Sequence, residues 1–197
     1  HDDPDNRLLR HDLMLGLERS GDVAMSRLAY AQARGEYWTA LARELAEEGK
    51  GKPSTEDHIR DLIISFNNVG RVEEATGENE QAQKYFTEAH ERTVALQKRH
   101  PNNHHYARDL LLSYGKLGDL AMAKKSFAHA KRHFDESVRL ASYLQSQDAY
   151  DRQVRIDLAC YYNKRGEALQ AMADEPSPLR AGKPDSAERH KLLAAAR

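Results

Sequence analysis

Apolar residues recur along the chain with the spacing of one face of an α-helix. They stand eight and four residues before, and two residues after, a glycine that recurs as Gly21, Gly70, Gly118 and Gly166. The apolar residues at these three positions are Leu13, Leu62, Leu110 and Leu158, then Leu17, Phe66, Tyr114 and Tyr162, and then Val23, Val72, Leu120 and Ala168. Spacings of about 3.6 residues per turn predict a buried helical stripe around each glycine.

The four glycines are 49, 48 and 48 residues apart, and an Asp-Leu pair that precedes each of them keeps the same spacing. Self-similarity at such a period is typical of stacked units that contact mainly their neighbours. A residue of the N-cap type stands at the same place in each unit, as Asn6, Thr55, Asn103 and Asp151, and each is able to accept a hydrogen bond from a helix start. The pattern therefore predicts an all-α array with four equivalent first helices.

A second helix is predicted after each of the first three glycines. The chain there carries a small, an aromatic and again a small residue at spacings of four and three: Ala33, Tyr37 and Ala40; Ala82, Phe86 and Ala89; Ala130, Phe134 and Ser137. The turn between the helices is clearest at Gly77, whose place is taken by Leu28 and Lys125 in the other units. Because a glycine within a helix costs about 1 kcal/mol relative to alanine, its repetition predicts close approach of the second helix.

These residues resemble the signature of the tetratricopeptide repeat (TPR) family, in which Leu-Gly, Gly, Ala, Phe and Ala stand at fixed offsets. The second unit matches best, with Gly70, Gly77, Ala82, Phe86 and Ala89. The usual unit has about 34 residues, so the longer unit of this chain predicts helices of about 20 residues. The stretch from Arg108 to Asp119 is similar to long-helix TPR arrays of bacterial signalling proteins, including some serine/threonine kinases. The resemblance implies a right-handed TPR-like α-solenoid of antiparallel helix pairs.

The expected array covers residues 1–173, with units at about 4–52, 53–100 and 101–148 and the first helix of a fourth unit at 149–173. Residues 174–197 contain three prolines and predict a loop. A short helix after it would either cap the array or link it to a further domain. Since the chain opens on residues that match an inter-repeat linker, it is expected to be a fragment of a larger protein.

Composition narrows the classes of function. The net charge is -1, with 30 basic and 31 acidic residues interspersed, which gives no general electrostatic case for nucleic acid or an anionic membrane. No apolar run approaches the roughly 20 residues that span a bilayer. The single cysteine, Cys160, lies in an apolar stretch and is expected to be a buried, inert thiol, and one cysteine fits a reducing, cytoplasmic compartment.

The resemblance implies that the first helices line a concave face and that positions around each glycine point into it. The candidate partner-binding residues are Arg19, Asn67, Asn68, Arg71, Lys116, Asn163 and Lys164. Asn and Lys side chains on successive helices can bind the backbone or terminal carboxylate of an extended peptide, as in the carboxylate-clamp TPR proteins that bind chaperone tails. In the alternative interpretation, Arg19–Asp22, Lys116–Asp119 and Lys164–Glu167 pair along their own helices.

Catalytic and metal chemistry find little support. The repeated aspartate (Asp12, Asp61, Asp109, Asp157) is expected to bind the adjacent repeat, as Arg60 and Arg108 beside it suggest. His129 and His133 share a helix face but offer only two metal ligands. No nucleophile, base and orienting group emerge as a set, and no phosphate-binding loop is visible, so neither enzyme activity, a metal nor a cofactor is predicted.

The predicted function is a non-enzymatic protein–protein interaction module that binds a peptide or partner domain on the concave face. Two alternatives remain open. The first is a regulatory domain that senses a signalling peptide, and the second is an assembly module that stacks copies end to end as a homo-oligomer.

Overall fold

The computed structural model describes residues 4–50 and 55–175, and all regular structure in these two ranges is α-helical. The helices are α1 (Pro4–Ser26), α2 (Tyr30–Glu48), α3 (Glu56–Ala75), α4 (Asn79–Arg99), α5 (His104–Ala123), α6 (Phe127–Gln147) and α7 (Arg152–Asp174). Their lengths of 19 to 23 residues confirm the long helices expected from the period. The side chains of residues 4–8 and 10 lie outside the description.

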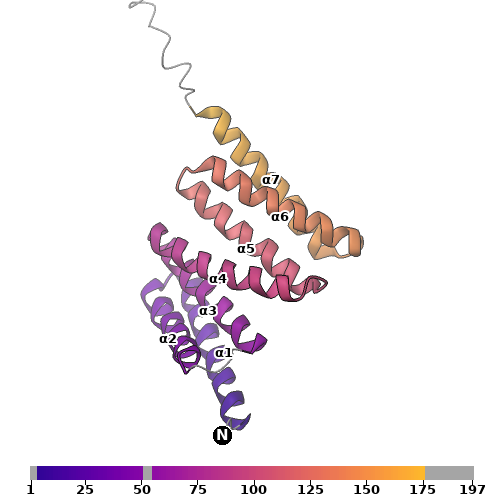
Figure 1. Ribbon diagram of the computed structural model, residues 1–197. Helices are drawn as coiled ribbons and strands as arrows, with labels where there is room; N and C mark the ends of the chain where they lie inside the picture. The colour runs from indigo at the N-terminus through magenta and orange to yellow at the C-terminus, as the bar shows by residue number, and fades with distance from the viewer. Residues whose placement is uncertain (1–3, 51–54, 176–197) are drawn as a thin grey trace, which may run out of the picture.

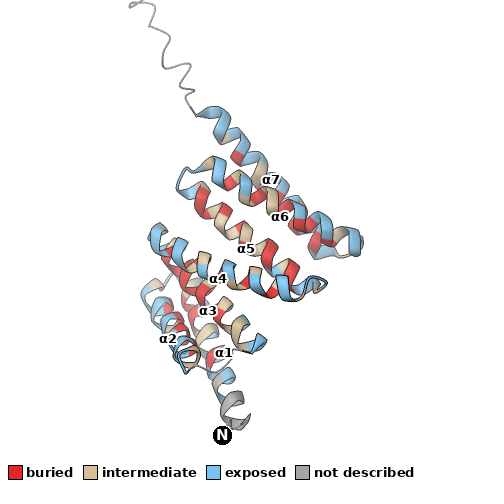
Figure 2. Ribbon diagram, in the orientation of Figure 1, coloured by how far each residue is buried: buried red, intermediate tan, exposed pale blue. Residues whose placement is uncertain are grey.

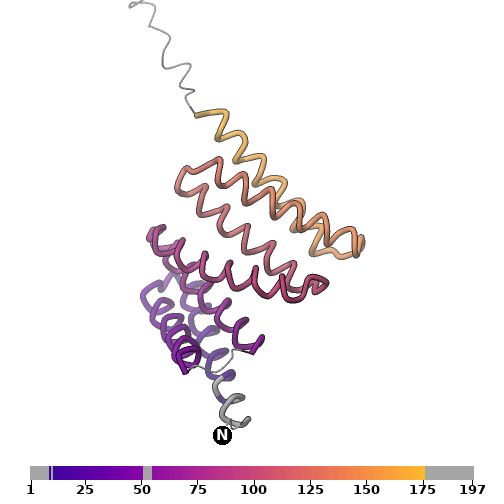
Figure 3. Tube along the Cα trace, in the orientation of Figure 1, coloured from indigo at the N-terminus to yellow at the C-terminus, as the bar shows by residue number. Residues whose placement is uncertain are grey.

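Each helix packs mainly on its neighbours in chain order. The result is an elongated stack with α1 at one end and α7 at the other (Figure 1). Short connections join the helices of each pair, and Figure 3 follows the chain upward from one pair to the next. The all-α array of stacked helices is thus present, and the expected loop and capping helix fall almost entirely in residues 176–197, outside the described residues.

Three of the four predicted N-caps are confirmed. The side chains of Thr55, Asn103 and Asp151 accept hydrogen bonds from backbone N–H groups at the starts of α3, α5 and α7. The prediction for Asn6 is wrong, because α1 already includes Pro4 and Asn6 lies within the helix. Proline fits the first turn of a helix, where its missing N–H would have no partner anyway.

The turn inside each helix pair has the same geometry in all three pairs. Leu28, Gly77 and Lys125 have positive φ angles of 58°, 84° and 56°. The next residue donates to the carbonyl five positions earlier, as in Ala29 N to Ala24 O at 2.8 Å and Ser126 N to Ala121 O at 2.8 Å. This is the Schellman ending of an α-helix, which favours glycine at the left-handed position. The turn predicted at Gly77 is therefore confirmed, and it is kept where glycine is absent.

The repeated glycine faces the aromatic residue of its own second helix. A Cβ added to Gly21, Gly70 or Gly118 would stand far inside van der Waals distance of the ring of Tyr37, Phe86 or Phe134. These rings and the small residues beside them are buried, and Figure 2 shows the buried residues between the helices. The predicted close approach is confirmed for these three pairs, and the ring rather than the backbone makes the closest contact.

The apolar stripe is mostly buried in the inner helices and partly exposed in α1 and α7. Leu62, Phe66 and Val72 of α3 are at most 5% exposed. Val23 of α1 is 49% exposed, because the described structure places no helix before α1. Cys160 of α7 is exposed, as is Ile64 at the equivalent position of the inner helix α3, so the prediction of a buried thiol is wrong.

Candidate protein-binding surface on the first helices

Ion pairs join α1 to α3 and α5 to α7. Arg71 Nη1 of α3 donates to Asp22 Oδ1 of α1 at 3.3 Å, and Lys164 Nζ of α7 donates to Asp119 Oδ1 of α5 at 2.6 Å. The sequence-based alternative placed Asp22 and Asp119 in pairs within their own helices. That alternative is wrong for both, since their ion-pair partners stand 49 and 45 residues away.

Two of the four repeated aspartates, Asp61 and Asp157, link neighbouring units as predicted. Asp157 is 7% exposed and accepts from Arg108 Nε at 3.0 Å. In the first two units His11 Nδ1 lies 3.7 Å from Asp61 Oδ2. Buried carboxylates are seldom tolerated without a charged or hydrogen-bonded partner, so the ion pairs of Asp61 and Asp157 help to hold neighbouring units together.

Six charged side chains from α1, α3, α5 and α7 form what we call the charged row. Its members are Asp22, Arg71, Glu74, Lys116, Asp119 and Lys164. They alternate in sign, and each influences its neighbours: Asp119 raises the pKa of Glu74, whereas Lys116 and Lys164 lower it. Burial contributes more than these charges and raises the pKa of Glu74 above its usual value.

Lys116 differs from the other cations of the row. Among the described residues it has neither a hydrogen bond nor an ion pair, and its Nζ lies 5.6 Å from the centre of the Phe86 ring. Burial lowers the pKa of Lys116, and Arg71 lowers it further, although Glu74 and Asp119 partly offset this. A partly buried cation without a carboxylate partner is a site where an anion gains more than it would in water.

The other predicted binding residues have separate environments. Asn67 Nδ2 donates to Ile63 O in its own helix at 2.9 Å, and the buried Asn68 accepts from Arg71 at 3.2 Å. Arg19 and Asn163 are exposed, and within residues 4–50 and 55–175 neither has a hydrogen bond or an ion pair. The structure thus brings Asn68, Arg71 and Lys116 together, and it leaves Arg19 and Asn163 open to solvent.

The opposite end of the same face is acidic. Burial raises the pKa of Glu18 to about 7, and Asp61 and Asp22 add to the shift, while His11 opposes it. On α2, Glu44 is paired with His58 Nδ1 at 2.8 Å. Sequence reasoning placed Glu18 on this face without assigning it a role, because the carboxylates around it come from three helices and share no sequence spacing.

The histidines and the serine hydroxyls are the remaining candidates for metal or catalytic chemistry. No group of three or more His, Cys, Asp or Glu residues in the described part of the chain has the arrangement of a metal site, and the pair His129 and His133 remains without further ligands. His90 Nδ1 lies 2.8 Å from Ser113 Oγ, but Ser113 is 6% exposed. A substrate does not reach that hydroxyl in this conformation.

None of the described helices is long and apolar enough to cross a membrane. No curated protein shows a significant match to the chain. A family model described as a protein of unknown function (DUF2753) matches residues 17–115, from the middle of α1 into α5. Because this match covers half of the chain, the protein belongs to the DUF2753 family.

Proposed function

We propose that the chain is a non-enzymatic interaction module that binds a peptide or a partner domain along the face of its first helices. In this proposal the stack is a right-handed, TPR-like superhelix of a bacterial cytoplasmic protein, and the first helices line its concave side. The observation that supports it most strongly is Lys116, a partly buried cation without an ion-pair partner in the described structure.

The charges of the face suggest how a ligand is oriented. A carboxylate of the ligand would bind Lys116, where it also lies within the field of Arg71. A basic part of the ligand would lie toward Glu18 and the carboxylates around it. Complementary charges of this kind mainly fix register and discriminate against wrong partners. The preferred ligand is therefore an extended peptide with an acidic group at one end and a basic group at the other.

The test is a peptide selection followed by two matched measurements. Peptides with free C-termini are selected on the intact chain, and their dissociation constants are measured by calorimetry. Lys116→Met keeps the apolar stem of the side chain over Phe86 but removes the charge, so binding is expected to weaken by about 10- to 100-fold. Lys84→Met changes an exposed lysine on α4 and should leave the affinity unchanged.

A second arm identifies the group that Lys116 binds. Where the selected acidic group is the C-terminal carboxylate, amidation should weaken binding to the original chain but have little further effect on the Lys116→Met variant. Equal affinity of all selected peptides for both lysine variants, in chains with unchanged helicity, would show that this face does not carry the binding site.

A further inference from the structure

One side of α2 carries an exposed apolar seam. Six positions follow one another at alternating spacings of four and three residues, which is the pattern that lets one helix pack along another. These positions, which we call the α2 seam, are Ala31, Gly35, Trp38, Ala42 and Leu45 of α2 and Gly49, the C-cap residue that follows it. All six are exposed, whereas Ala33, Tyr37, Ala40 and Leu41 on the other side of α2 are fully buried in the stack.

The internal repeat supplies a comparison for this seam. At the equivalent positions α4 has Glu80, Lys84, Thr87, Glu91, Val94 and Lys98, and α6 has Ala128, Arg132, Asp135, Arg139, Ser142 and Ser146. Both sets are mainly polar or charged, as expected for the solvated side of a helix. The α2 seam carries no charge at all. The repeat therefore does not explain why these six positions of the α2 seam are uncharged and mainly apolar.

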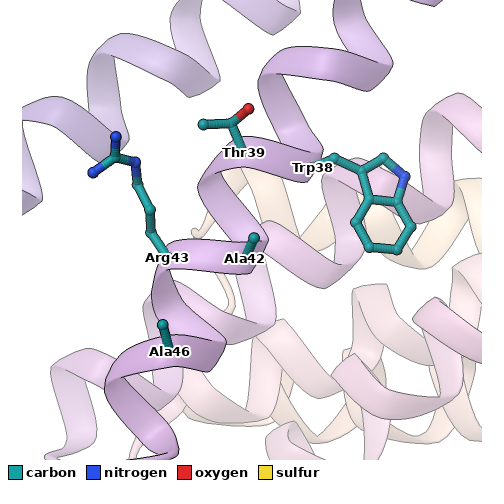
Figure 4. A pocket seen from close by; sticks show the side chains of 5 residues that line it. All are labelled: Trp38, Thr39, Ala42, Arg43 and Ala46. Atoms are coloured by element: carbon teal, nitrogen blue, oxygen red, sulfur yellow. The ribbon is translucent and has the colours of Figure 1, made fainter.

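Two features of the seam are only partly explained by contacts within the chain. Gly35 lies in mid-helix, where glycine is unfavourable, and a Cβ added to it would meet nothing within 4 Å. Trp38 and Leu45 are each 38% exposed, although the edge of the Trp38 ring packs against Tyr85 of α4. Beside Trp38, a shallow open hollow is lined by Trp38, Thr39, Ala42, Arg43 and Ala46 (Figure 4).

We infer that the α2 seam is the interface of a homodimer in which α2 packs antiparallel against α2 of a second copy. When the two helices run in opposite directions about a two-fold axis near Thr39 and Ala40, each large seam residue meets a small one. Trp38 then lies opposite Ala42 of the second copy, Leu45 opposite Gly35, and Ala31 opposite Gly49. A two-fold interface must match itself in this way, because the same patch serves both subunits.

Charges beside the seam favour the same arrangement. Arg34 and Glu48 flank opposite ends of α2. Each already has an ion pair within the chain, Arg34 with Glu73 at 2.9 Å and Glu48 with Arg92 at 3.3 Å, but their side chains are still 50% and 39% exposed. An antiparallel pair brings the Arg34 end of one copy to the Glu48 end of the other, whereas a parallel pair would bring like charges together. The seam lies on a second helix, so the first-helix face stays free and the dimer does not depend on peptide binding.

The first test transfers two residues of α4 to the equivalent positions of α2. Gly35→Lys combined with Ala42→Glu places buried charges in the interface, and we expect at least about a hundredfold weaker self-association in sedimentation equilibrium. Both positions are exposed, and lysine favours a helix more than glycine does, so the variant should keep its helicity. The control, Ala128→Lys with Ser142→Glu, makes similar changes at exposed positions of α6 and should dimerise like the original chain.

The second test determines the direction of the helices by cross-linking single cysteines in a Cys160→Ser background. A short bismaleimide should join two Thr39→Cys chains, which meet near the axis. Ala31→Cys should not cross-link to itself, but a mixture of Ala31→Cys and Gly49→Cys should form a cross-linked dimer. A chain that stays monomeric at all concentrations, a Gly35→Lys/Ala42→Glu variant that dimerises unchanged, or self-cross-linking of Ala31→Cys would overturn the inference.

Discussion

At the scale of single residues, the turns inside the helix pairs place one residue in the left-handed region regardless of its side chain. Leu28 and Lys125 adopt positive φ angles at which Gly77 stands in the second pair. A side chain in this region costs roughly 1–2 kcal/mol per residue. The surrounding Schellman hydrogen bonds and the packing of the two helices are strong enough to impose the conformation.

Replacing Lys125 by glycine is therefore expected to stabilise the protein. Lys125→Gly relieves the left-handed strain, and the extra freedom of glycine in the unfolded chain offsets part of the gain, which leaves about 1 kcal/mol. The free energy of unfolding in urea measures this effect. Ala123→Gly, at the end of α5, is the control and should lower stability by about 0.5–1 kcal/mol. A loss of stability on Lys125→Gly would mean that the side chain makes a compensating contact.

At the scale of elements, a helix takes its environment from the helices on both sides of it, and this distinguishes α7 from α3 and α5. Gly118 of α5 is covered by the Phe134 ring, whereas a Cβ added to Gly166 of α7 meets nothing within 4 Å. The two glycines occupy the same position of the repeat. They nevertheless differ in packing, because the described structure contains no second helix after α7.

The same substitution at these two glycines should therefore have opposite effects. Gly118→Ala forces its methyl group into the ring of Phe134, and overpacking of this kind costs about 1–3 kcal/mol. Gly166→Ala places a methyl group in open space and gains up to about 1 kcal/mol of helix propensity. Chemical unfolding of both variants tests the contrast. A loss of stability at Gly166 would indicate that another segment or a second chain covers α7.

At the scale of the whole molecule, the sequence predicts what repeats and misses what depends on position in the stack. The period, the N-caps at Thr55, Asn103 and Asp151 and the buried aromatic ridge all follow from local patterns. The exposure of Cys160 does not, because Cys160 lies between the stripe positions Leu158 and Tyr162, and apolar neighbours along the chain do not show which helix face a side chain occupies. Asp119 has basic residues both within its helix and on α7, and only the three-dimensional arrangement shows that Lys164 is its partner.

The acidic end of the first-helix face makes the stability of the whole stack depend on pH. Burial and the nearby carboxylates of Asp61 and Asp22 raise the pKa of Glu18 from 4.5 to about 7. The folded protein therefore binds this proton more tightly than the unfolded chain does. Below pH 4.5 Glu18 is protonated in both the folded and the unfolded chain, so it does not affect the free energy of unfolding. As the pH rises from 4.5 toward 7, the carboxyl ionises more readily in the unfolded chain, and the free energy of unfolding falls. Above about pH 7 this loss is complete.

Glu18→Gln removes this cost because the amide stays neutral at every pH. Relative to the original chain, the variant should gain about 1 kcal/mol of unfolding free energy between about pH 5 and about pH 8, after allowance for solvent screening of a half-buried carboxyl. Urea unfolding at the two pH values measures the change, and Glu91→Gln, on the exposed side of α4, should show none. If the Glu18→Gln difference is the same at both pH values, the carboxyl ionises in the folded protein as it does in the unfolded chain, and the charges of Asp61 and Asp22 are screened from it.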